Sequence, residues 1–141
     1  MKHWPSSILS IALLTAGIFT GSLSVAPEAQ AQAGTRVFEL RTYTSHEGKL
    51  DDVVARFRNH TTKLFEKHGI TNIGYWVPRE QPNTLVYLIA HSSRDVANKS
   101  WDAFRKDPDW IAARTASEVN GPIVAKVQSV FMDPTNFSGL K

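Results

Sequence analysis

The sequence predicts an α+β fold in which two helices cover one face of a four-stranded antiparallel sheet. Beyond residue 33, apolar residues repeat with strand and helix periods in the order β-α-β-β-α-β. The short polar loop 79–83 predicts a hairpin between the two middle strands. Two right-handed crossovers then place both helices on the same face and give the sheet order 4-1-3-2. This arrangement is the ferredoxin-like fold.

Composition limits the functions open to this 141-residue chain. It has no Cys, so disulfides, thiolate metal sites and catalytic thiols are excluded. The formal net charge is only +3, and no run of Lys or Arg exceeds two residues, so we expect no nucleic-acid partner. No cluster of His, Asp or Glu has metal-ligand spacing, and we expect neither a metal nor a cofactor.

The first 33 residues read as an export signal. Lys2 and His3 precede an apolar stretch, residues 8–25, and two overlapping A-x-A sites end at Ala33. An uncleaved membrane anchor is the alternative, but glycines and hydroxyl residues dilute a stretch that is barely long enough to span. We therefore predict a signal peptide over 1–33 and a mature domain over 34–141. The mature chain is expected in the periplasm or outside the cell, without stable membrane insertion.

The elements of the first half follow from periodicity. Residues 36–44 alternate as a strand, and a turn follows at 45–48. Apolar side chains three and four apart over 49–68 predict an amphipathic helix, which Gly69 ends. Residues 70–77 form the second expected strand, stopped by Pro78.

The second half repeats the pattern. Residues 84–91 predict a strongly apolar third strand, and Ser93 is the expected N-cap of a second helix. The pair Asp107-Pro108 interrupts this helix before it resumes over 110–119, and residues 126–132 form the fourth strand. The aromatic residues of this region are expected to pack in the core: Trp101, Phe104 and Trp110.

The face of the sheet that the helices leave uncovered is the first place to look for a site. If Phe38 and Leu40 face the helices, alternation puts Glu39, Arg41 and Tyr43 on the open face. Arg41 then either pairs with Glu39 as a structural ion pair or holds an anionic ligand.

The third strand offers two sets of residues for the same open face. One set contains Tyr87 and His91, and the other contains Val86, Leu88 and Ala90. We assign Tyr87 and His91 to the open face, because a tyrosine and a histidine suit a half-polar cavity. A second copy would cover such a face, giving a homodimeric α/β barrel with an enclosed cavity.

Five residues are accordingly the candidate ligand-binding set: Glu39, Arg41, Tyr43, Tyr87 and His91. The two tyrosines either offer hydroxyls to a ligand or pack across strands. His91, between a strand and a helix, is either a general base or a capping residue.

Several segments resemble the NIPSNAP family, over 36 to about 137. The resemblance is carried by Phe38-Glu39-Leu40-Arg41-Thr42-Tyr43, Phe57-Arg58, Leu64-Phe65-Glu66-Lys67-His68-Gly69-Ile70, Gly74-Tyr75-Trp76 and, most specifically, Trp101-Asp102-Ala103-Phe104-Arg105-Lys106-Asp107-Pro108-Asp109-Trp110. It implies a dimeric α/β barrel like that of the antibiotic-biosynthesis monooxygenases. The family has no generally established catalytic residues, so the resemblance carries no catalytic role over to this chain. Animal members of the family are mitochondrial and linked to vesicle traffic and mitochondrial quality control, roles that an export signal does not fit.

The sequence thus favours an exported, dimeric module that binds a small hydrophobic or aromatic molecule or responds to stress. The alternative is a cofactor-independent oxygenase or isomerase acting on such a molecule in the cavity. A second alternative is a protein-interaction module.

Overall fold

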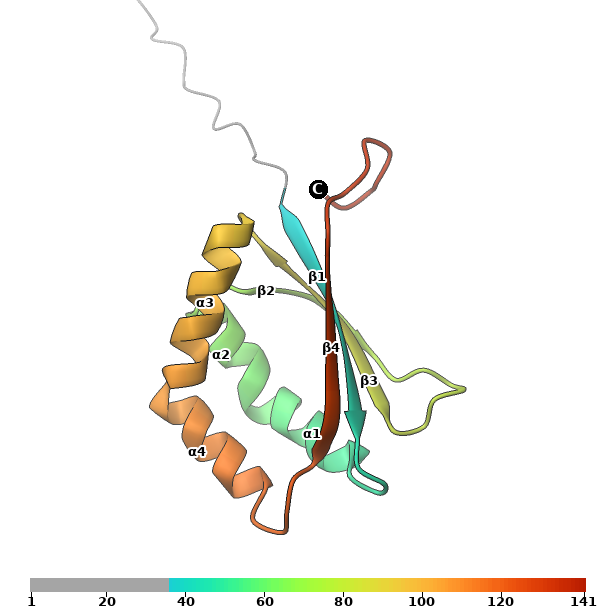
Figure 1. Ribbon diagram of the computed structural model, residues 1–141, viewed down its shortest axis with the longest axis vertical. Coiled ribbons are helices and arrows are strands. Elements are labelled where there is room, and N and C mark those ends of the chain that lie inside the picture. The colour runs from blue at the N-terminus through green and yellow to red at the C-terminus, as the bar shows by residue number, and fades with distance from the viewer. Residues whose placement is uncertain (1–35) are drawn as a thin grey trace, which may run out of the picture. The chain divides into compact units, whose positions relative to one another are not determined.

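The structure, a computed structural model, describes residues 36–141, so the expected signal segment 1–33 lies outside the described residues. Its four strands form one antiparallel sheet in the order β2-β3-β1-β4, which confirms the expected topology. The strands are β1 (Val37–Ser45), β2 (Thr71–Trp76), β3 (Thr84–His91) and β4 (Val124–Met132). The helices lie together on one side of this sheet (Figure 1).

The first helical segment contains a π-helical turn that periodicity did not reveal. α1 (Leu50–Arg56) leads into the turn η1 (Phe57–Thr61) and then α2 (Thr62–Lys67). The amide of Thr62 bonds the Phe57 carbonyl, and the Thr61 hydroxyl bonds the carbonyl of Arg56 at 3.3 Å. Gly69 ends the segment with a φ of 72°, as its C-cap position predicted.

The second helical segment is divided in two. Ser93 caps α3 (Arg94–Lys106) by accepting a hydrogen bond from the Val96 amide. Asp107 caps α4 (Pro108–Ser117), whose first residue is a proline that needs no amide partner. Among the helices described over 36–141, none is both long enough and apolar enough to cross a membrane.

An aromatic cluster joins the helices to the sheet. The Phe57 ring lies 5.0 Å from Tyr87 and 5.5 Å from Tyr43, measured between ring centroids. Phe65 lies 5.3 Å from Trp101 and 5.0 Å from Phe104 in the same manner. The core therefore sits between the helices and one face of the sheet, as expected for Trp101 and Phe104.

The assignment of the two sheet faces was wrong. The expected grouping is present, because Arg41 lies opposite Tyr87 across the β1–β3 pairing and Val37 lies opposite His91. However, this group faces the helices and not the open side: Glu39 and Tyr87 are 1% and 0% exposed. The physical reason is volume, because the rings of this face fill the space under the helices that aliphatic side chains would leave empty.

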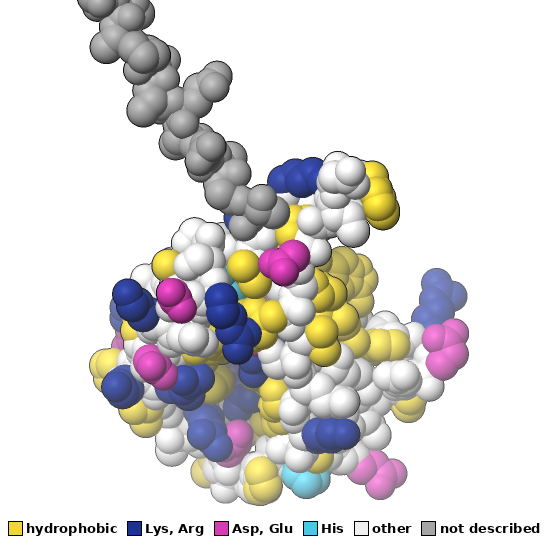
Figure 2. All heavy atoms as spheres, turned by 45° about the horizontal axis from the view of Figure 1, so that its top comes forward, with side chains coloured by type: hydrophobic (Ala, Val, Ile, Leu, Met, Phe, Trp, Pro, Cys, Tyr) yellow, Lys and Arg dark blue, Asp and Glu magenta, His cyan; other side chains and the backbone are white. Residues whose placement is uncertain are grey.

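The open face is apolar around the first half of β1, and polar side chains of β4 lie toward its other end. Alternation puts Leu40, Leu88 and Val130 there, with Leu40 paired to both of the others across the strands. Val130 is 55% exposed and Trp76, at the end of β2, is 53% exposed. Hydrophobic side chains gather over the sheet in Figure 2, whereas Lys and Arg side chains gather mainly over the helices. Part of this face still lacks a cover.

Candidate functional site

A buried carboxylate organises the face of the sheet beneath the helices. Oε1 of Glu39 accepts hydrogen bonds from Arg41 Nη1 and Ser129 Oγ, each at 2.6 Å. Oε2 accepts one from Trp101 Nε1 at 2.7 Å, and His91 Nε2 lies 3.1 Å from it. Four donors from β1, β3, β4 and α3 therefore converge on one side chain.

The donors determine the charge state of Glu39. Burial by itself raises the pKa of this carboxyl group, but the hydrogen bonds, from His91 first, outweigh burial and lower the pKa to about 2. The carboxylate is therefore ionised at neutral pH and can only accept hydrogen bonds. It holds Arg41 and Trp101 in fixed positions.

Arg41 extends from this carboxylate toward the space between helices and sheet. Its Nε donates to the Tyr87 hydroxyl at 2.9 Å, and its guanidinium carbon lies 4.3 Å from the centre of a Trp101 ring. The side chain is 15% exposed, against 1% for Glu39. The two roles that the sequence left open for Arg41, a structural ion pair and a contact to an anionic ligand, are therefore compatible, since Arg41 is ion-paired and still reaches a cavity.

The two tyrosines differ in their surroundings. Tyr87 is fully buried, and its burial raises the pKa of the hydroxyl well above 10, so it stays protonated while it accepts from Arg41. Tyr43 is half-buried and lines a cavity that also contacts Arg41. Only Tyr43 of the pair is placed to meet a ligand directly.

His91 lies behind the network and not at a cavity wall. Its side chain is 0% exposed, and it lines neither the cavity beside Arg41 nor three others within residues 36–141. Because an ionised carboxylate only accepts, Nε2 carries the proton, and Nδ1 is left buried without a partner. A general-base role with direct substrate contact does not fit this position, and His91 instead positions Glu39.

The cavity itself, which we call the inner cleft, lies between the sheet and the second helical segment and measures about 340 Å³. That volume falls at the low end for small-molecule sites. Arg41, Tyr43, Val124 and Val127 line it from β1 and β4. From the helices it is lined by Arg56, Trp101, Phe104, Arg105, Trp110 and Arg114, and from the segment after α4 by Glu118 and Pro122.

Arg56 and Glu118 are the site residues that sequence reasoning missed. Arg56 Nη1 lies 3.1 Å from Glu118 Oε1 and donates to Ser117 Oγ at the same distance. Arg114 Nε pairs with the other Glu118 oxygen at 3.1 Å. A basic residue beside Val53 and Phe57 on the buried side of the first helix was the available signal.

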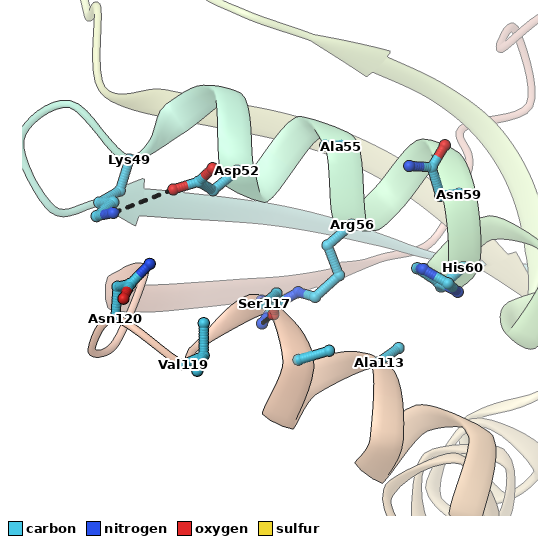
Figure 3. A pocket seen from close by; sticks show the side chains of 11 residues that line it. Lys49, Asp52, Ala55, Arg56, Asn59, His60, Ala113, Ser117, Val119 and Asn120 are labelled. Atoms are coloured by element: carbon cyan, nitrogen blue, oxygen red, sulfur yellow. Dashed lines mark hydrogen bonds and ion pairs between the residues drawn. The ribbon is translucent and has the colours of Figure 1, made fainter.

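A second cavity, the outer groove, lies between the two helical segments on the side away from the sheet. It measures about 330 Å³ and is lined mainly by small and polar residues of α1, η1 and α4 (Figure 3). Arg56 reaches across it from α1 toward Ser117 and also lines the inner cleft. The outer groove lacks the aromatic walls of the inner cleft, so the inner cleft is the stronger candidate for a ligand site.

The segment Trp101–Trp110 has a structural role beside its aromatic walls. Asp107 Oδ1 accepts from the Asp109 amide at 2.8 Å, which caps α4. Its other oxygen lies 2.8 Å from Lys67 Nζ and 2.6 Å from His68 Nε2, and hydrogen bonds from Lys67 first and then His68 hold the pKa of Asp107 well below its usual range. The segment thus ties the end of α2 to the α3–α4 junction.

No group of three or more His, Asp or Glu side chains within residues 36–141 is arranged to hold a metal ion. The polar groups that line the inner cleft are four guanidinium groups, the Tyr43 hydroxyl, the Glu118 carboxylate and two indole rings.

The fold and this cleft define a ferredoxin-like α+β domain with a polar, aromatic pocket under its helices. A sequence profile of the NIPSNAP family matches residues 38–139, and the chain belongs to that family. No match was found among curated proteins.

Solved structures agree on the fold. A NIPSNAP family protein of unknown function from Agrobacterium tumefaciens has 20% identity and a TM-score of 0.67, over 77% of this chain and 96% of that one. A NIPSNAP-like domain protein from Burkholderia xenovorans has 16% identity and a TM-score of 0.64, over 74% and 90%. A putative antibiotic biosynthesis monooxygenase from Chloroflexus aurantiacus has 12% identity and a TM-score of 0.52, over 75% and 99%.

Proposed function

We propose that this protein binds a small hydrophobic or aromatic molecule in the inner cleft, and that it does so as an exported homodimer. The observation that carries the proposal is a cleft walled by aromatic rings into which a fixed, partly exposed Arg41 projects. Such a combination of apolar walls and a few oriented polar groups is typical of ligand sites. A cleft that is open and not filled by its own side chains also favours binding over a purely interacting module.

The dimer rests on the open face of the sheet. Leu40, Leu88 and Val130 form an apolar surface, and such surfaces are normally covered in soluble proteins. Face-to-face packing of two copies would bury it, with the inner clefts on the outer sides of the barrel. This arrangement replaces the cavity expected between the two sheets with one cleft in each subunit.

The test is native mass spectrometry of the protein purified gently from the compartment to which it is exported. We expect a dimer whose mass exceeds twice that of the chain by the mass of bound molecules. Val127→Trp fills the inner cleft from β4, where Val127 is 44% exposed, and should remove the extra mass while the dimer remains.

The matched control is Val119→Trp, which places the same ring in the outer groove at a residue that is 78% exposed. It should leave the extra mass unchanged. Loss of the bound molecule in Val119→Trp but not in Val127→Trp would assign the ligand to the outer groove and overturn the proposal.

A second candidate function, a cofactor-independent oxygenase or isomerase, is favoured by one observation. Tyr43 and Arg41 line the same cleft, so a proton-handling hydroxyl and an orienting cation are available to one substrate. Once a ligand is known, Tyr43→Phe distinguishes the two functions. Turnover by the unchanged protein that is lost in the variant, with unchanged affinity, indicates an enzyme. Binding without turnover in either protein indicates a binding protein.

A further inference from the structure

Arginine side chains are concentrated around the inner cleft. Arg41, Arg56, Arg105 and Arg114 reach it from β1, α1, α3 and α4, respectively, and Glu118 is the only carboxylate among the lining residues. Glu118 is shared between two of these arginines, while Glu39 and Asp102 pair with the other two. Four guanidinium groups against three carboxylates leave a net positive charge around the cleft.

Two of these arginines retain unused donors. Arg41 uses Nε on Tyr87 and Nη1 on Glu39, and its Nη2 has no hydrogen-bond partner among the described residues. The Nε of Arg56, a side chain only 3% exposed, is buried without a partner. The unpaired Nε of Arg56 costs free energy because it is buried. The Nη2 of Arg41 belongs to a partly exposed side chain and is free to donate to an anionic acceptor in the cleft.

The remaining walls are flat and apolar. The rings of Phe104 and Trp110 lie 4.6 Å apart between centroids, and Trp101 presents its indole beside Arg41. Val124 and Val127 face them from β4. An aromatic ring fits between such walls, because stacked and edge-on contacts add to the burial of its apolar surface.

We infer that the ligand of the inner cleft is a small aromatic anion, a carboxylate or an equivalent oxyanion on a ring, whose charged oxygen accepts from Nη2 of Arg41. This inference rests on the proposed function, since it names the class of molecule that the inner cleft binds. The cation on Arg41 persists at every physiological pH, so recognition depends on the ionisation of the ligand alone.

The test compares 2-naphthoate with its neutral isostere 2-naphthamide by isothermal titration calorimetry on the purified protein, with octanoate as a non-aromatic anion. A charge-assisted hydrogen bond in a partly buried site predicts that naphthoate binds about ten- to a hundredfold more tightly than naphthamide. Octanoate is expected to bind more weakly than naphthoate.

The variants locate this preference. Arg41→Gln should bring the affinities for naphthoate and naphthamide within about threefold of each other, while Arg79→Gln, an exposed arginine of the β2–β3 loop, should change nothing. Arg41→Lys keeps the positive charge beside Glu39 if Arg41→Gln folds poorly, and it should lose part of the preference because one ammonium replaces a fork of donors.

The outcomes separate the two proposals. Equal affinity for naphthoate and naphthamide overturns the inference that the ligand is an anion and leaves the proposed function standing. Tighter binding of octanoate than of naphthoate overturns the inference that the ligand is aromatic. Binding of none of the three compounds, by a protein that also carries no extra mass, overturns the proposed function itself.

Discussion

The two faces of the sheet differ in the opposite sense to the usual one, in which the buried face is apolar and the exposed face is polar. The face beneath the helices holds an ionised carboxylate, an arginine, a histidine and two tyrosines, whereas the face left open carries an aliphatic patch around Leu40. Burying Glu39 is tolerated because four donors surround it, and leaving Leu40 and Leu88 outside is tolerated only if something covers them. The covered face therefore builds a site, and the open face indicates an interface.

The largest effect is expected from a substitution at Glu39 on the covered face. Glu39→Gln removes the charge that pairs with Arg41 and satisfies Trp101, and should lower the free energy of unfolding by about 3 to 5 kcal/mol. Urea denaturation monitored by circular dichroism measures it. Glu47→Gln, at an exposed position of the turn after β1, is the control and should shift the free energy by less than about 0.5 kcal/mol.

The acid response of Glu39 tests the same network without a mutation. Since the pKa of Glu39 falls from 4.5 to about 2 on folding, the unfolded chain takes up the proton first as the pH drops. The stabilisation is therefore complete above about pH 5 and lost toward pH 2, and it amounts to about 3 kcal/mol. The ¹³C carboxyl resonance of Glu39 should titrate near pH 2, and a midpoint above 4 would contradict the network.

A charge introduced on the open face tests whether that face is the dimer interface. Val130→Glu should raise the dissociation constant of the proposed dimer about a hundredfold, because each interface would contain the charge twice. Analytical ultracentrifugation measures the change, and the monomer should stay folded because Val130 is 55% exposed. Val119→Glu, on the helical side, should leave the dimer intact; an unchanged dimer in Val130→Glu would place the interface elsewhere.

The smallest effect is expected from a substitution that removes a single hydrogen-bond donor from the covered face. Ser129→Ala deletes the 2.6 Å hydrogen bond to Glu39 from β4 and leaves the other three partners in place. We expect a loss of about 1 kcal/mol in the free energy of unfolding, by thermal or urea denaturation. A loss as large as that of Glu39→Gln would show that Ser129 holds the network together rather than completing it.

Most of the fold could be predicted from local sequence. Alternation located β1 and β3, the spacing of apolar residues located the first helical segment, and Ser93 and Gly69 marked helix ends as observed. The π-helical turn at Phe57–Thr61 was not predictable, because its extra residue changes the phase of a helix without changing its composition.

The candidate site was predictable only as a set. Period-two alternation groups Glu39, Arg41 and Tyr43 together, and strand pairing adds Tyr87 and His91, as the register shows. Alternation does not say which set faces the helices when both sets contain apolar residues. Arg56 and Glu118 were not predicted because they pair with each other, and Arg56 lies in α1 whereas Glu118 follows α4, far along the chain.

The sequence by itself determined the order of elements, the topology of the sheet and the membership of its two faces. These depend on residues near one another along the chain and on the handedness of crossovers. Only the tertiary structure decided which face the helices cover and what surrounds Glu39. Its partners His91, Trp101 and Ser129 lie 52, 62 and 90 residues away, and only folding brings their donors to one carboxylate.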